Sequence, residues 1–232
     1  MNRKVELHDL GLIEYQKAWD YQEERFRRLV DFKRVGEGPL PEQYLLFCEH
    51  PHVYTLGKSG DENNPLIHKD FLKKIDATYY KTNRGGDITY HGPGQIVGYP
   101  ILDLESLGIG LKQYVHLLEE AMIRLLQKEG ITATRMEGAT GVWLDASHPV
   151  KARKICAIGV RSSRYVTMHG FALNVNTNLD YFTYINPCGF DTKGVTSMEK
   201  ELNRTLDLEQ VKSELRGILM ELFPVPVKSA TA

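Results

Sequence analysis

The sequence contains 232 residues, 42% of them hydrophobic, which is enough to bury one sizeable core and predicts a single globular domain covering residues 1–232. Its 29 basic residues nearly balance its 30 acidic ones. Without an excess of positive charge, neither nucleic acid nor an anionic membrane surface is an expected partner.

The N-terminal residues and the cysteines indicate the compartment. The N-terminus lacks the apolar segment of a signal peptide, and no run approaches the roughly 18 apolar residues of a membrane span. Cys48, Cys156 and Cys188 form no C-x-x-C pair, which argues against a disulfide framework and a zinc thiolate site. His50-x-His52 lacks a third ligand at a recognisable spacing. The sequence predicts a soluble cytoplasmic protein without a metal.

The first part of the chain predicts strands and one long helix. A strand is expected at residues 5–8, followed by a helix whose apolar residues recur at helical spacing over residues 15–30 and which ends before Gly36. The apolar runs 44–48 and 53–56 have the length of strands and are predicted as two strands joined by a turn.

The second part predicts two further helices around a hairpin. Apolar residues at i, i+3 and i+4 spacing begin at Leu111 and stop at Gly130, as in an amphipathic helix. Residues 154–161 and 165–175 are rich in Ile, Val and Phe and predict a hairpin, and a last helix is expected within residues 207–223. Clustered strands with few intervening helices favour an α+β fold with a mixed or antiparallel sheet and flanking helices.

One segment combines backbone freedom with polar side chains. Residues 84–95 read Arg-Gly-Gly-Asp-Ile-Thr-Tyr-His-Gly-Pro-Gly-Gln. Glycines permit close approach of the backbone to a ligand, while Arg84, Thr89, Tyr90 and His91 supply hydrogen-bond donors and an acid or base. The segment matches neither a dinucleotide fingerprint nor a P-loop, and an ordinary glycine-rich loop remains an alternative.

Two residues are candidates for nucleophilic chemistry. Cys188 lies between Pro187 and Gly189, which suits a thiol presented on a rigid turn near backbone N–H groups, although a lone cysteine is more commonly a buried structural residue. A nearby cation would favour its thiolate, and Lys154 enters the predicted strand, although a solvated lysine at a strand edge is the alternative.

The other cysteines are expected to be less reactive. Cys48 lies in an apolar strand run, where burial disfavours a thiolate. Cys156 lies two residues from Lys154, so alternation along the strand predicts that both side chains share one face, with the thiol packed within the sheet.

Residues 84–95 match the signature R-G-G-x-x-T-[aromatic]-H-x-x-G-Q without a mismatch. On this motif the chain resembles the octanoyl-acyl-carrier-protein:protein octanoyltransferases of lipoate biosynthesis. Further similar segments are Glu-His-Pro at 49–51, Lys-Ile at 154–155, His-Gly-Phe-Ala-Leu-Asn at 169–174 and Ile-Asn-Pro-Cys-Gly at 185–189. The resemblance covers roughly residues 44–200.

The resemblance implies a fold similar to the catalytic domains of biotin and lipoate protein ligases. It implies that Cys188 becomes an octanoyl thioester, that Lys154 lowers the pKa of this thiol, and that no cofactor is needed. The donor would be octanoyl-acyl carrier protein, and the acceptors would be the lipoyl domains of 2-oxoacid dehydrogenases and the glycine cleavage H protein. The implied substrate-binding residues are Arg84, Gly85, Gly86, Asp87, Ile88, Thr89, Tyr90, His91, Ala157, Ile158, Gly159, Gly170, Phe171 and Ala172.

Two other functions remain open. An ATP-dependent lipoate- or biotin-type protein ligase would share the fold and a strand lysine, but lipoate ligases typically follow the motif histidine with Asp-x-Gly-Asn, whereas Gly-Pro-Gly-Gln follows His91 here. A non-catalytic module that binds acyl groups or a carrier protein would make no use of Cys188.

Overall fold

The computed structural model describes residues 5–38, 41–60, 69–185, 193–223 and 227–228. Its helices are α1 (Tyr15–Val35), α2 (Lys69–Lys74), α3 (Leu111–Lys128), α4 (Met198–Leu202) and α5 (Leu208–Leu222), with the 3-10 turns η1 (Leu104–Leu107) and η2 (Leu179–Tyr184). Its strands are β1 (Val5–Leu12), β2 (Gln43–Glu49), β3 (Val53–Leu56), β4 (Thr78–Lys81), β5 (Ile88–His91), β6 (Gln95–Ile101), β7 (Thr134–Met136), β8 (Ala139–Leu144), β9 (Arg153–Ser163), β10 (Val166–Asn174), β11 (Gly194–Val195) and β12 (Val227–Lys228).

The strands form two sheets. Within the described part of the chain, nine strands form a mixed sheet in the order β12-β1-β2-β6-β10-β9-β8-β7, with β11 beside β9. The strand β1 pairs in parallel with β2 and β12, whereas β2, β6, β10, β9, β8 and β7 pair antiparallel in succession. A smaller sheet has the order β4-β3-β5. This architecture confirms the predicted α+β class with a mixed sheet.

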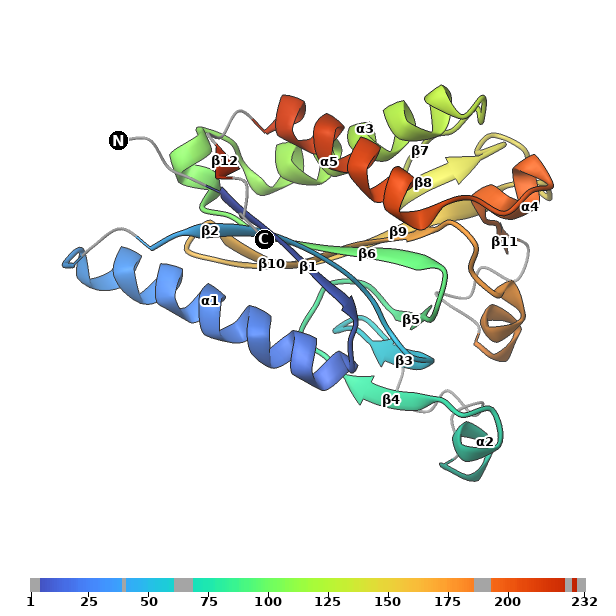
Figure 1. The fold of residues 1–232 in the computed structure, drawn as a ribbon, viewed down its shortest axis with the longest axis horizontal. Coiled ribbons are helices and arrows are strands. Elements are labelled where there is room, and N and C mark those ends of the chain that lie inside the picture. The colour runs from blue at the N-terminus through green and yellow to red at the C-terminus, as the bar shows by residue number, and fades with distance from the viewer. Residues whose placement is uncertain (1–4, 39–40, 61–68, 186–192, 224–226, 229–232) are drawn as a thin grey trace.

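Helices cover both faces of the larger sheet. Figure 1 shows α1 along one face and α3 with α5 along the other. Under α3 and α5, Leu118, Met122 and Leu215 are fully buried in the main core, because the apolar stripes of both helices turn toward the sheet. Under α1, Ala18 and Phe26 join a second core. The site described below lies on the same sheet, beside β9 and β10.

The helix ends follow from local chemistry. Gly36 ends α1 in the left-handed region at φ 76°, where its N–H donates to the Phe32 carbonyl. Asp207 caps α5 by accepting hydrogen bonds from the backbone N–H groups of Glu209 and Gln210 at 2.9 and 3.3 Å. The predicted helices that become α1, α3 and α5 are therefore confirmed.

The predicted strands at residues 44–48 and 53–56 are confirmed, and three details of the strands were not given by the sequence. The adjacent strands β2 and β3 belong to different sheets, because β2 pairs with β6 and β3 pairs with β5. The segment predicted as a loop over residues 84–91 contains strand β5. The predicted hairpin is present as β9 and β10, but its turn lies at Arg164 and Tyr165, whose φ angles of 49° and 63° give the left-handed pair that a two-residue hairpin turn requires.

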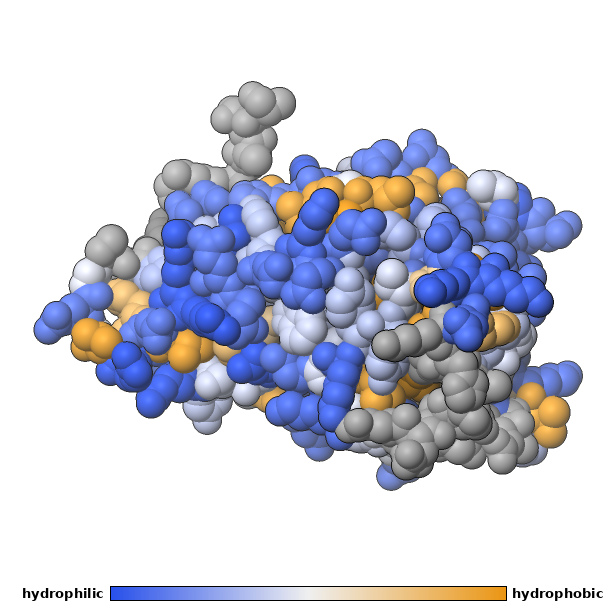
Figure 2. Space-filling view, turned by 90° about the horizontal axis from the view of Figure 1, so that it is seen from below, coloured by the Kyte–Doolittle hydropathy of each residue, from blue (hydrophilic) through white to orange (hydrophobic). Residues whose placement is uncertain are grey.

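Among the described residues, no helix is both long and apolar enough to cross a membrane. Figure 2 shows one face of the molecule as largely hydrophilic, with apolar side chains in small separate groups.

Candidate active site

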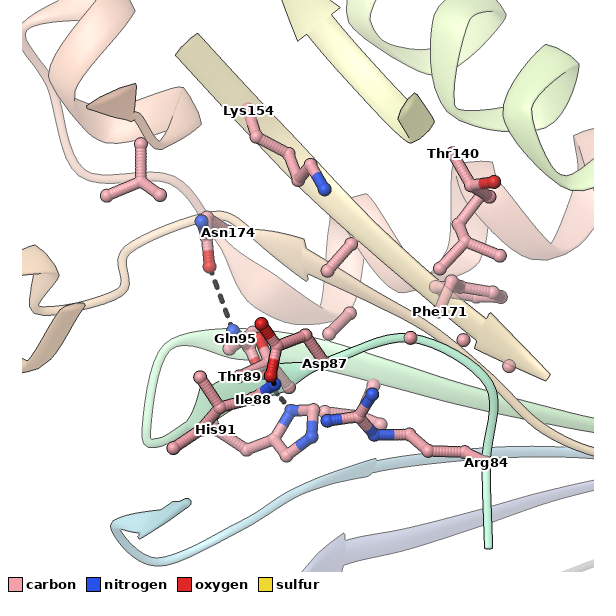
Figure 3. A pocket seen from close by; sticks show the side chains of 18 of the residues that line it. Arg84, Asp87, Ile88, Thr89, His91, Gln95, Thr140, Lys154, Phe171 and Asn174 are labelled. Atoms are coloured by element: carbon pink, nitrogen blue, oxygen red, sulfur yellow. Dashed lines mark hydrogen bonds between the residues drawn. The ribbon is translucent and has the colours of Figure 1, made fainter. Parts of the chain in front are cut away.

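One cavity gathers most of the predicted site residues. It has a volume of about 340 Å³ and lies between β5, β8, β9 and β10. In Figure 3, Lys154 reaches into it from β9, while Arg84 and His91 lie on the opposite side and Phe171 lies on a third. The predicted residues that line it are Arg84, Gly86, Asp87, Ile88, Thr89, His91, Lys154, Ala157, Ile158, Gly159, Gly170, Phe171 and Ala172.

Two predicted residues do not line the cavity, and a third lies outside the described residues. Tyr90 is buried in the small sheet, where its hydroxyl lies 2.7 Å from His52 Nδ1, and Gly85 contacts β9 through its backbone; neither is among the cavity-lining residues. Alternation explains Tyr90, because its neighbours Thr89 and His91 point to the other face of β5. Cys188 lies outside the described residues.

The cavity also contains residues that the site prediction omitted. They include Tyr15, Gln95, Val97, Tyr99, Trp143, His169, Asn174, Phe182 and Lys193. Gln95, His169 and Asn174 belong to motifs recognised in the sequence, so the signal for them was present. Tyr15 was assigned to the apolar stripe of a helix, and Trp143 and Lys193 carried no distinguishing pattern.

The segment containing Arg84 packs closely against β9. The Gly85 N–H donates to the Val160 carbonyl at 2.9 Å. A Cβ atom on Gly159 would lie 2.8 Å from the Gly85 carbonyl oxygen, so only glycine permits this approach. The glycines of the motif therefore bring one wall of the cavity against the strand that carries Lys154.

A hydrogen-bond network fixes Arg84 and His91. The Arg84 guanidinium donates to Thr55 Oγ1 at 3.0 Å and to the Gly85 carbonyl at 3.0 Å. The side chain of Gln95 donates to Asn174 Oδ1 at 2.9 Å, which leaves its own oxygen as the acceptor for His91 Nδ1 at 2.8 Å. His91 therefore carries its proton on Nδ1.

The histidines near the cavity are held neutral. Burial lowers the pKa of His91 to about 3, with His50 contributing further, and burial lowers the pKa of His169 to about 3. Burial also lowers the pKa of His50 to about 4, and its Nδ1 donates to the Ile13 carbonyl at 2.7 Å while Nε2 accepts from the Tyr99 hydroxyl at 2.7 Å. The imidazoles therefore add no charge to this end of the cavity near pH 7, where the Arg84 guanidinium lies beside them.

Because these three histidines are neutral in the folded protein, we expect the free energy of unfolding to fall steeply below pH 6.5. In the unfolded chain each imidazole binds a proton near pH 6.5, but in the folded chain His50, His91 and His169 bind theirs only near pH 3–4. The unfolded state therefore binds more protons in this window, and each histidine contributes a slope of up to about 1.4 kcal/mol per pH unit. Urea unfolding at pH 7, 6 and 5 measures this slope.

Imidazole titration by NMR provides the control. The rings of His50, His91 and His169 should remain neutral at pH 5, because burial lowers the pKa of each. Protonation of these rings above pH 5 would contradict the assignment.

Lys154 owes its direction to an irregularity in the sheet. Between β8 and β9, Trp143 pairs with Lys154 and Val142 pairs with Cys156, so β9 contains one extra residue at this point. Such a bulge re-aims the side chains next to it. The Lys154 ammonium lies 4.6 Å from the centre of the Trp143 ring and lines the cavity.

Because of this bulge, the expectation that Cys156 shares one face of the strand with Lys154 was wrong. Because the neighbours Val142 and Trp143 point to opposite faces of β8, their partners Cys156 and Lys154 also do so. Cys156 is fully buried in the main core and does not share the face of Lys154. Alternation alone fails here because it assumes an unbroken strand.

Alkylation should therefore distinguish the thiols. Burial raises the pKa of both Cys48 and Cys156 well above the ordinary range, and both side chains are inaccessible. A dilute alkylating agent near neutral pH is expected to modify Cys188 first, and peptide mapping after partial reaction measures this order. Label accumulating on Cys156 in step with lost activity would contradict it.

A known protein family and known sequences are similar to this chain over most of its length. A family model described as the lipoyl protein ligase A/B catalytic domain matches residues 14–219. An octanoyltransferase of Bacteroides fragilis strain YCH46 is 61% identical over 216 residues, which cover 93% of this chain and 96% of that relative.

Solved structures show the same fold. Lipoate-protein ligase A bound with ATP superposes with a TM-score of 0.72 at 16% identity, covering 100% of this chain and 90% of that chain. Biotin protein ligase from Aquifex aeolicus in complex with biotin and ATP gives 0.50 at 12% identity, covering 94% and 70%. These identities support a shared fold, which confirms the fold prediction, and do not define the reaction.

Proposed function

Since this chain belongs to the octanoyltransferase family within the lipoyl protein ligase A/B catalytic domains and is an acyltransferase, we propose that it transfers octanoyl groups by way of a Cys188 thioester. The donor is octanoyl-acyl carrier protein, and the acceptor is a lysine of a lipoyl domain. The whole chain serves as one catalytic domain in the cytoplasm.

In the first half-reaction, the Cys188 thiolate attacks the carbonyl carbon of the donor thioester. The bond from this carbon to the carrier sulfur breaks, and the leaving thiolate takes the proton of the Lys154 ammonium. The products are octanoyl-Cys188, the free carrier thiol and a neutral Lys154 amine. A thioester replaces a thioester, so no nucleotide is consumed.

In the second half-reaction, the neutral acceptor amine attacks the carbonyl carbon of octanoyl-Cys188. An amide forms, the bond to the Cys188 sulfur breaks, and Lys154 accepts the proton that the new amide nitrogen loses. The Cys188 thiolate and the Lys154 ammonium are then restored. One cysteine and one lysine thus serve both steps.

The observation that carries this proposal is the position of Lys154. Its ammonium lines the cavity together with apolar side chains, glycine backbone, neutral imidazoles and the charged side chains of Arg84, Asp87 and Lys193. Phe182 and Lys193, which flank the undescribed segment 186–192, both line the same cavity. Described residues on both sides of the segment containing Cys188 therefore line the cavity that contains Lys154.

The ligase alternative receives less support. Curated relatives named octanoyltransferase reach 61% identity over nearly the full length, whereas the ligases resemble this chain only at the level of fold. The ligase reaction needs ATP, so nucleotide dependence separates the two functions.

A transfer assay without nucleotide tests the proposal. Octanoyl-acyl carrier protein and a lipoyl domain are incubated with the protein, and the mass of the lipoyl domain is followed with and without ATP. We expect one octanoyl group per domain at equal rates in both conditions. Modification that requires ATP and free octanoate would overturn the proposal in favour of a ligase.

A further inference from the structure

His169 has a strained backbone in the middle of β10. Its φ angle of 57° lies in the left-handed region, which residues with a side chain rarely adopt within a strand. Its backbone N–H donates to the side-chain oxygen of Gln22 on α1 at 3.0 Å, and both residues are buried. Such a conformation persists only where the surrounding contacts hold it, and it often marks a functional position.

One hydrogen bond orients the imidazole ring of His169. Burial lowers the pKa of this ring to about 3, so it is neutral near pH 7. Its Nε2 lies 2.7 Å from Asn83 Oδ1, and because an amide oxygen only accepts, Nε2 carries the proton and Nδ1 does not. The buried Nδ1 has no hydrogen-bond partner among the described residues. The contact with Asn83 is therefore the one that sets the direction of the ring.

The loop that contains Asn83 also contacts the residue opposite His169. This loop, residues 82–87, joins β4 to β5 in the smaller sheet. Two residues after Asn83, the Gly85 N–H donates to the Val160 carbonyl at 2.9 Å. Val160 is the residue that faces His169 across the hairpin of β9 and β10. The loop is therefore bonded to both members of one cross-strand pair.

These contacts join two walls of the cavity. Arg84, which lies between Asn83 and Gly85 in the loop, lines the cavity from the side of the smaller sheet, whereas His169 lines it from the larger sheet. In Figure 3, Arg84 lies on the side of the cavity opposite Lys154. The separation of the two walls therefore depends on the bonds that connect the loop with the hairpin.

Helix α1 supports His169 on the side away from the loop. Trp19 and Gln22 are three residues apart on α1 and lie on one face of it. The centres of the Trp19 and His169 rings are 6.1 Å apart, and Gln22 accepts the His169 N–H. His169 is thus held by a helix and a strand, whereas Asn83 lies in a loop. The ring is therefore the fixed partner, and the loop is the partner that it positions.

We propose that His169 is a positioning residue that fixes the loop of residues 82–87 to the hairpin of β9 and β10 and thereby sets the shape of the cavity for the acyl donor. The inference rests on the proposed function, because it takes the ligand of the cavity to be the octanoyl donor. Loss of the contact between His169 and Asn83 loosens the loop that carries Arg84. The cavity then binds the donor less tightly, while the reacting groups are unchanged.

Two variants that break this contact from opposite sides test the inference. His169→Gly removes the ring and suits a φ angle of 57°, so it adds no backbone strain. Asn83→Ala removes the acceptor and keeps the ring, and Asn83 is not among the residues that line the cavity. In each variant we expect amide hydrogen exchange across residues 82–87 of the free protein to become about fivefold faster, the factor that one hydrogen bond between neutral groups usually contributes.

Steady-state kinetics distinguish this role from a purely structural one. Each variant should raise KM for octanoyl-acyl carrier protein by about fivefold with little change in kcat, and the double variant should be no worse than either single one. Asn203→Gly, at an exposed residue with a φ angle of 50° after α4, is the matched control and should leave exchange and KM unchanged.

Two outcomes would overturn the inference: unchanged loop exchange in both single variants, or effects on KM that add in the double variant. Transfer that requires ATP and free octanoate would instead overturn the proposed function and leave the exchange result standing.

Discussion

Replacement of Cys188 by serine is expected to reduce transfer by on the order of a thousandfold or more, because the hydroxyl is far less acidic than a thiol and Lys154 alone does not activate it. The hydroxyl would have to lose its proton before attacking the donor thioester. Initial rates with octanoyl-acyl carrier protein and a lipoyl domain measure the loss.

Cys156→Ala is the matched control for this prediction. It removes a thiol that is fully buried in the main core and does not line the cavity. We expect it to lower stability, as deletion of a buried group does, and to retain transfer. Near wild-type transfer by Cys188→Ser would exclude Cys188 as the nucleophile.

Replacement of Lys154 by methionine is expected to lower the rate by about 10²–10⁴-fold, the usual contribution of a positioned acid or base. Methionine keeps much of the aliphatic volume beside Trp143 but supplies neither charge nor proton. Lys154→Arg should also be poor, because a guanidinium keeps the charge but does not release a proton near neutral pH. Steady-state kinetics should show the loss mainly in kcat.

Lys151→Met is the control for Lys154. Lys151 precedes the same strand but is exposed and absent from the cavity lining, so its replacement should leave kcat and KM unchanged. Full activity in Lys154→Arg would restrict Lys154 to an electrostatic role and remove it from proton transfer.

The sequence predicted those elements whose stabilising contacts lie within one periodic segment. Helices α1, α3 and α5 were found because apolar side chains recur at helical spacing and glycine or aspartate marks an end. The separation of β2 from β3 was not predicted, because it depends on distant partners: β2 pairs with β6, and β3 pairs with β5 and β4.

The candidate site was also predicted from the sequence only in part. Arg84, His91 and Lys154 were identified from a motif and its resemblance to a known family, and the structure brings them to one cavity. Trp143 and Lys193 line the same cavity but were missed, because the pairings of β8 and β11 with β9 have no local signature in the sequence. Local pattern thus identified the residues of a motif more readily than the residues that distant strand pairings bring to the same cavity.

The Cys188 thioester is tested by the intact mass of the protein after brief incubation with octanoyl-acyl carrier protein, without ATP and without acceptor. We expect an increase by one octanoyl group that maps to Cys188, is released by hydroxylamine as a thioester is, and disappears when a lipoyl domain is added. An unchanged mass in protein that still modifies the lipoyl domain, or an octanoyl group on another residue, would contradict it.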